Sequence, residues 1–246
     1  MEQLLTYIVV ALGWMCGGIV GGATGIGGVM IAMPLLTLVL DPGDAILVSC
    51  LVAATACVHL AWAYRRFIVW PDVWPLLAGM VPGLIAGVAM LKIAPVPVLE
   101  LMICAMLVCF LLMQCSPRLA RFSVPASLPL GLGAGAVSGF VASSVAMSGA
   151  PLGIYVLLMH WEPDRARGNM SIFYLCSGIS AMLMQAFSGL YSYSLLKLGV
   201  AALAGCMAGQ TLGVSLGRHI SRETFRRILL IFLAAAAVVL FVRAVS

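Results

Sequence analysis

Two short stretches of the sequence carry the residue types that can bind an anion without a charged side chain. The first, residues 21–34, places five glycines in an apolar segment that ends at Pro34. The second, residues 143–151, contains three serines, one glycine and Pro151. Glycine frees backbone N–H groups from helical geometry, and serine adds hydroxyl donors. Within a bilayer such groups need protein, water or a ligand as partner, so each stretch is a candidate binding site.

The same breaks should create helix N-termini. Segments that begin near Gly27 and near Ser148 would direct free N–H groups, and the positive end of the helix dipole, into a shared space. Neither stretch contains Asp, Glu, Lys or Arg, which disfavours a metal site or a carboxylate proton relay. We expect no catalytic residue, metal or cofactor. The predicted substrate-binding residues are Thr24, Gly25, Gly27, Gly28, Pro34, Ser143, Ser144, Ser148, Gly149, Pro151 and Tyr155.

Other polar or thiol side chains lie within apolar segments. His59 could carry a coupling proton, with a hydrogen-bonded structural histidine as the alternative. Asn169 follows the second break and is a candidate for the pathway. Cys50 and Cys57 are seven residues apart and share one helical face, where they could handle sulfur. Packing as small apolar residues is the alternative for both.

Two glutamines and the remaining cysteines have simpler interpretations. Gln185 and Gln210 are expected to form hydrogen bonds between helices. The eight cysteines include no CxxC pair, so neither a disulfide framework nor a zinc site is predicted.

The composition indicates a membrane protein. Charged residues are 9% of the 246, against roughly 25% in soluble domains, and the mean hydropathy is +1.16. Apolar runs long enough to cross a bilayer recur along the chain. The 13 basic residues are scattered between these runs, which does not favour nucleic acid as a partner. A small anion and the lipid bilayer are the expected partners, and a homodimer is an open alternative.

The apolar segments occur in the same order twice, which predicts an all-α polytopic protein of two repeats in one membrane domain, residues 1–246. Repeat 1 covers about 1–118 and repeat 2 about 121–246. Each would contain a broken helix or hairpin followed by three spans, and whether this makes six spans plus two hairpins or eight to ten spans stays open. The expected segments are 5–23, 27–40, 44–64, 73–92 and 97–114 in the first half, and 125–146, a short segment to His160, 168–189, 194–217 and 223–243 in the second.

Three glycines support the repeat, because Gly79, Gly83 and Gly87 recur 126 residues later as Gly205, Gly209 and Gly213. If each break returns the chain to its starting side, three spans then invert the second half relative to the first. Under this topology ten Lys and Arg residues share one side and three share the other. The positive-inside rule assigns the first side to the cytoplasm and both termini to the outer side.

The break motifs resemble those of a transporter family. Gly25-Ile26-Gly27-Gly28 with Pro34-Leu35-Leu36, Met147-Ser148-Gly149-Ala150-Pro151 with Tyr155, and the stretch Tyr64-Arg65-Arg66-Phe67-Ile68-Val69-Trp70 are similar to segments of the TauE/SafE sulfite and organosulfonate exporters, of the 4-toluene sulfonate uptake permease type. The resemblance implies export of sulfur-containing anions across the bacterial inner membrane. Ala150, Ser143 and Ser144 depart from the family pattern, which leaves the location of the site intact and bears on the substrate.

Inverted repeats with a broken helix in each half are typical of secondary transporters that bind substrate near the midplane. We therefore predict alternating access around the two breaks. A passive anion channel would share the same breaks and is the first alternative. An intramembrane serine hydrolase built on Ser148 is the second, and it would require a histidine base within reach.

Overall fold

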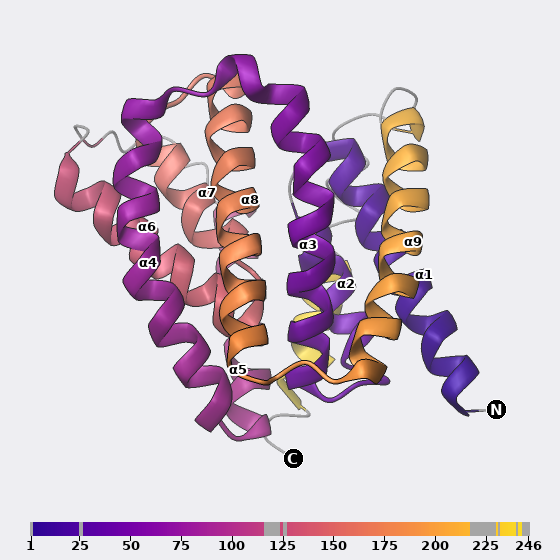
Figure 1. Ribbon diagram of the computed structural model, residues 1–246. Coiled ribbons are helices and arrows are strands. Elements are labelled where there is room, and N and C mark those ends of the chain that lie inside the picture. The colour runs from indigo at the N-terminus through magenta and orange to yellow at the C-terminus, as the bar shows by residue number, and fades with distance from the viewer. Residues whose placement is uncertain are drawn as a thin grey trace.

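The computed structural model describes residues 2–24, 27–115, 124, 127–216, 230, 232–239 and 241–242. Its regular structure is helical throughout, and these residues contain no strand (Figure 1). The all-α prediction is therefore confirmed for this part of the chain.

The two halves have their helices in the same order. A long helix is followed by a break, a short helix and further long helices in each half. The first half contains α1 (Glu2–Thr24), α2 (Gly28–Leu36), α3 (Pro42–Tyr64), the 3-10 turn η1 (Arg65–Phe67), α4 (Trp70–Ile93) and α5 (Val96–Cys115). The second half contains α6 (Leu128–Val145), α7 (Gly149–Leu158), α8 (Pro163–Phe187), α9 (Tyr193–Leu216) and further helical residues between 230 and 242.

Seven of the described helices are long and apolar enough to cross a bilayer, namely α1, α3, α4, α5, α6, α8 and α9. The chain is therefore a multi-pass membrane protein. The short helices α2 and α7 have 9 and 10 residues. At 1.5 Å per residue, neither could cross a hydrocarbon core of about 30 Å.

Helix starts differ from the sequence prediction at three prolines. Residues 42–43, 70–72 and 163–167 were predicted to be turn or loop, but they form the first turns of α3, α4 and α8. Pro42, Pro71 and Pro163 each occupy one of the first two helical positions. A missing N–H has no cost there, and the fixed φ of proline suits a helix.

Glycines bring two pairs of helices into close contact. A Cβ atom at Gly205, Gly209 or Gly213 of α9 would overlap backbone atoms of Ala11, Met15 or Ile19 of α1, and one at Gly79, Gly83 or Gly87 of α4 would overlap Leu132, Ala136 or Phe140 of α6. Residue numbers rise together along both partners, so each pair is parallel. The predicted correspondence between the two glycine triplets thus has a physical basis in two equivalent seams.

The remaining central contact, between α3 and α8, is antiparallel. Gly178 lies against Ala54, and Gly168 lies against Phe67. The chain reverses at η1 between α3 and α4, and again between α8 and α9 (Figure 1). Consequently α1, α3 and α9 run one way and α4, α6 and α8 the other. An inverted repeat would require these directions, and the repeat itself stays a prediction.

Candidate functional site

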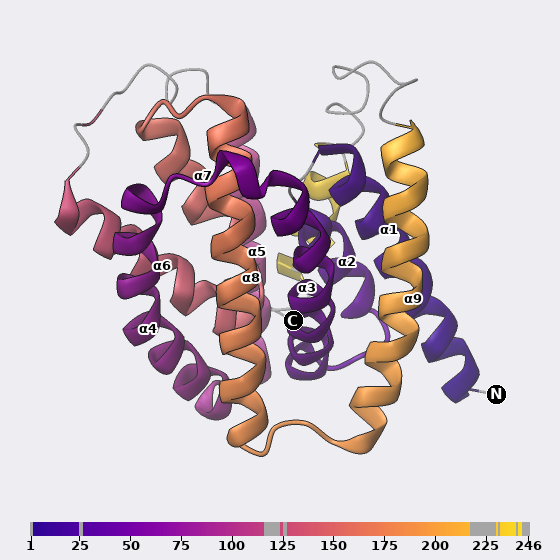
Figure 2. The same cartoon turned by 45° about the horizontal axis from the view of Figure 1, so that its top comes forward.

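The two helix breaks line one cavity of about 140 Å³. That space is roughly ten times what a single water molecule needs. Gly27 and Gly28 contribute from the first break, and Ser148 and Gly149 from the second. Residues of α1, α3, α8 and α9 supply most of the other walls. Figure 2 shows the short helix α2 beside α1 and α3.

Backbone conformation explains the first break. Gly27 precedes α2 with a φ of 92°, in the left-handed region that favours glycine. The start of α2 also packs closely on α1, since a Cβ atom at Gly17 would lie 2.5 Å from the carbonyl oxygen of Gly28. Small residues at both positions therefore let the chain double back. Thr24 is the last residue of α1, its side chain lies outside the described part, and so does the whole of Gly25.

The second break has a different conformation. α6 ends at Val145, and Ala146 follows with a φ of 59°, which is uncommon for a residue with a side chain. Ser148 then precedes α7, is 8% exposed, and makes no side-chain cap hydrogen bond to that helix. In the first turn of α7, Pro151 has no N–H and Leu152 donates to the Ser148 carbonyl, so the N–H groups of Gly149 and Ala150 are the ones without a helical acceptor. The break thus presents donors to the cavity.

Protein donors pair with two carbonyl oxygens at the end of α6. The side-chain Nε2 of Gln185 donates to the Ser143 carbonyl at 3.0 Å, and the Cys50 thiol donates to the Ala142 carbonyl at 3.5 Å. The Tyr191 hydroxyl lies 3.0 Å from Gln185 Oε1. Burial raises the pKa of Tyr191, so this phenol remains a donor. The predicted interhelical hydrogen bond of Gln185 is confirmed, since it joins α8 to α6.

Six of the predicted binding and pathway residues line the cavity. They are Gly27, Gly28, Ser148, Gly149, Cys50 and Cys57.

Other predicted site residues lie elsewhere among the described residues. The Ser143 hydroxyl donates to the Leu84 carbonyl at 3.0 Å, and the Ser144 hydroxyl to the Phe140 carbonyl at 2.7 Å. These hydroxyls are therefore occupied by backbone acceptors. Pro34 is buried within α2, Pro151 is in the first turn of α7, and the Tyr155 ring packs on Trp161 at 5.6 Å between centroids. His59 belongs to α3, and its side chain is outside the described part.

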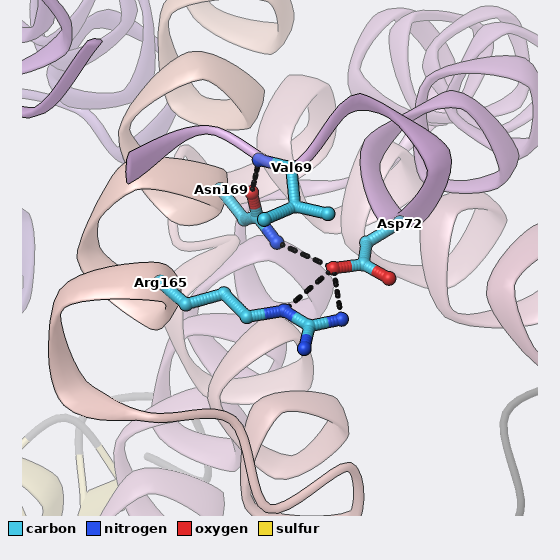
Figure 3. A network of polar contacts seen from close by, with 4 residues as sticks. All are labelled: Val69, Asp72, Arg165 and Asn169. Carbon is cyan, nitrogen blue, oxygen red and sulfur yellow. Dashed lines mark hydrogen bonds and ion pairs between the residues drawn. The ribbon is translucent and has the colours of Figure 1, made fainter. Parts of the chain in front are cut away.

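Asn169 lies in a polar network with Arg165 and with Val69 and Asp72, which follow η1 closely in the chain (Figure 3). Its Oδ1 accepts from the backbone N–H of Val69 at 2.8 Å, and its Nδ2 donates to Asp72 Oδ2 at 3.1 Å. Arg165 donates to the same carboxylate oxygen through Nε at 2.8 Å and pairs with it through a second nitrogen at 2.6 Å. This network links the first turns of α4 and α8, so Asn169 has a structural role.

Sequence reasoning missed several cavity residues. Trp14, Tyr174 and Ser177 line the cavity, as does Gln210, for which only helix contacts were predicted. An aromatic residue in an apolar span resembles any lipid-facing or core residue, so the pattern contained no signal for Trp14 or Tyr174. Spacing alone could have placed Ser177 and Tyr174 on one face of α8, three residues apart.

The described lining contains no Asp, Glu, Lys, Arg or His, so its polarity comes from neutral groups. Among the described residues, no group of three or more His, Cys, Asp and Glu could hold a metal ion. An anion in this cavity would be bound by hydroxyl, amide, indole and backbone donors. A low local dielectric would strengthen each of those hydrogen bonds.

Comparison with known proteins identifies the family. Residues 10–240 match the family model described as sulfite exporter TauE/SafE. No curated protein and no solved structure matches the chain significantly. The match covers both halves, both breaks and the described cavity, and the chain therefore belongs to the TauE/SafE sulfite exporter family.

Proposed function

We propose that the protein is a secondary transporter that exports small sulfur-containing oxyanions, such as sulfite or organosulfonates. The observation that carries this proposal is the shared cavity: Gly27 and Gly28 line the same space as Ser148 and Gly149, more than one hundred residues away in the sequence. Family membership supports the class of substrate. The site would hold the anion between the two breaks.

Neutral donors suit a transported anion. The starts of α2 and α7 offer N–H groups and the positive ends of two helix dipoles. Because the site contributes no full positive charge, the anion is bound weakly enough to be released on the other side of the membrane. The described lining includes no histidine that could act as a base for Ser148, which leaves the hydrolase alternative without support.

Alternating access is supported by an asymmetry about the cavity. Lining residues of α3 extend from Cys50 to Leu60, toward η1. On the opposite side, Gln185 and Tyr191 hydrogen-bond to each other, to the Ser143 carbonyl and to the Leu47 carbonyl. We propose that this network closes the outer side while the η1 side is open. Helices that run in opposite directions in the two halves would allow the converse state.

The proposed orientation follows from the arginines. Arg65, Arg66, Arg165 and Arg167 lie at the η1 end, as the close approach of Gly168 to Phe67 requires. The positive-inside rule assigns that end to the cytoplasm, in a bacterial inner membrane, with the termini outside. The other arginines counted from the sequence lie outside the described residues.

Flux through reconstituted proteoliposomes tests the proposal. Ser148→Ala should weaken sulfite or sulfonate binding about tenfold, because it removes one donor to a charged ligand. Ser171→Ala is the matched control, since Ser171 is buried and donates to the Gly168 carbonyl of its own helix. Gly28→Leu should abolish flux, whereas Gly133→Leu should not, because Gly133 faces open space. Normal flux in both Ser148→Ala and Gly28→Leu would refute the site.

The same vesicles separate a transporter from a channel. A coupled transporter should respond to an imposed pH or ion gradient at constant anion gradient. Channel flux should follow the electrochemical gradient of the anion alone, and that result would replace the transporter by the channel.

A further inference from the structure

Four buried side-chain donors have no hydrogen-bond partner among the described residues. They are Trp14 Nε1, Ser49 Oγ, Ser138 Oγ and the Tyr174 hydroxyl. Buried polar atoms in folded proteins are nearly always hydrogen-bonded, and leaving one unpaired is costly. Trp14 and Tyr174 differ from the two serines because they line the cavity between the helix breaks.

The two aromatic residues come from different parts of the fold. Trp14 is on α1, one turn before Gly17 and Gly18, and is only 2% exposed. Tyr174 is on α8, one turn before Ser177 and Gly178. All six residues line the same cavity. Both donor atoms are buried behind its surface, so a ligand reaches them when the two side chains turn toward it.

We propose that Trp14 Nε1 and the Tyr174 hydroxyl are specificity-determining donors that bind oxygen atoms of the transported anion. This inference rests on the proposed function and deepens it. An indole N–H can only donate, so Trp14 selects a ligand that presents an acceptor there. A ligand with several acceptor oxygens on one centre can meet these donors together with the N–H groups of α2 and α7. A sulfur oxyanion has that form.

Aromatic donors also suit the apolar walls. A tryptophan or tyrosine packs its ring among hydrophobic residues while its polar atom reaches a ligand. Neither side chain is positively charged, so no unpaired buried charge remains in the cavity after the anion leaves. A ligand without an oxyanion group would leave these two donors unpaired, so the site should bind it less tightly.

The test measures anion affinity and ligand-free stability in the same variants. Tyr174→Phe removes one hydroxyl and keeps the ring, and Trp14→Phe removes the indole N–H. Each should weaken sulfite or methanesulfonate binding, measured by titration calorimetry on the purified protein, by about tenfold to a hundredfold. The melting temperature of ligand-free Tyr174→Phe should be unchanged or higher, because an unpaired buried hydroxyl has been removed.

Ser49→Ala and Ser138→Ala are the matched controls. Each removes an unpaired buried hydroxyl that is outside the described cavity lining, so anion affinity should not change. Wild-type affinity in both aromatic variants would overturn the inference while Ser148→Ala still tests the proposed function. Equal weakening in the serine controls would also overturn it. Absence of oxyanion binding by the unmodified protein would overturn both proposals.

Discussion

A substitution within the α4–α6 seam tests the close packing of these two helices. An added Cβ at Gly139 of α6 would lie 2.5 Å from the Met80 carbonyl oxygen of α4. Real Cβ atoms keep at least 3.0 Å from such atoms, so Gly139→Ala requires a shift of at least about 0.5 Å. Backbone resists that shift, and overpacking of this kind costs about 1–3 kcal/mol.

Gly133→Ala on the same helix isolates this cost. Nothing lies within 4 Å of a Cβ at Gly133. Both substitutions gain the same helix propensity, about 1 kcal/mol, which cancels when the two variants are compared. Gly139→Ala should therefore be less stable than Gly133→Ala by about 1–3 kcal/mol.

Equilibrium unfolding in mixed micelles, followed by tryptophan fluorescence, measures the difference. Gly22→Ala extends the test to the other seam, because its Cβ would lie 2.5 Å from the Gln210 carbonyl oxygen of α9. A loss similar to that of Gly139→Ala is expected. Equal stability of Gly139→Ala and Gly133→Ala would refute the close approach of α4 to α6.

Two further predictions concern the polar network and the charge of the ligand. Asp72→Ala should lower the free energy of unfolding by about 1–3 kcal/mol, because it leaves the buried Asn169 amide without its acceptor. Arg165→Lys should lower it by less than about 1 kcal/mol, since the Arg165 side chain is 42% exposed. Chemical denaturation measures both variants. Equal losses of unfolding free energy would contradict the structural role of the Asp72–Asn169 hydrogen bond. The monoanion methanesulfonate should bind at least about tenfold more tightly than the dianion sulfate, because the described lining has no cation to offset a second charge. Calorimetry at fixed ionic strength measures the ratio, and tighter sulfate binding would contradict it.

The sequence predicted the helices well because hydrophobic runs, glycine breaks and the order of segments are local properties. It misplaced the starts of α3, α4 and α8, because a proline in a polar turn and a proline in a first helical turn look alike in sequence. The two cases differ in whether the chain continues as a helix, and this depends on the apolar residues that follow the proline.

The cavity could be predicted only in part. Gly27 and Gly28 were identifiable because their glycine cluster lacks the regular four-residue spacing of the packing glycines in α4 and α9, and because a second break occurs at the equivalent place in the other half. Ser143 and Ser144 have the same hydroxyl as Ser148, but their positions in the last turns of α6 bring backbone carbonyls within reach. Which serine keeps its hydroxyl available depends on helix ends and neighbouring backbones, and composition does not record these.

A broken membrane helix leaves unpaired carbonyls at one end and unpaired N–H groups at the other. At the second break, the carbonyl end and the N–H end have different surroundings. The carbonyls of Ala142 and Ser143 accept from Cys50 and Gln185, both of which belong to other helices. The N–H end at Gly149 lines the cavity instead. Protein donors thus pair with two carbonyls at the negative end of the break, while its positive end borders the cavity. In the proposed transporter this arrangement would favour an anion without lysine or arginine in the described lining, and Gln185 would keep the Ser143 carbonyl oxygen away from it.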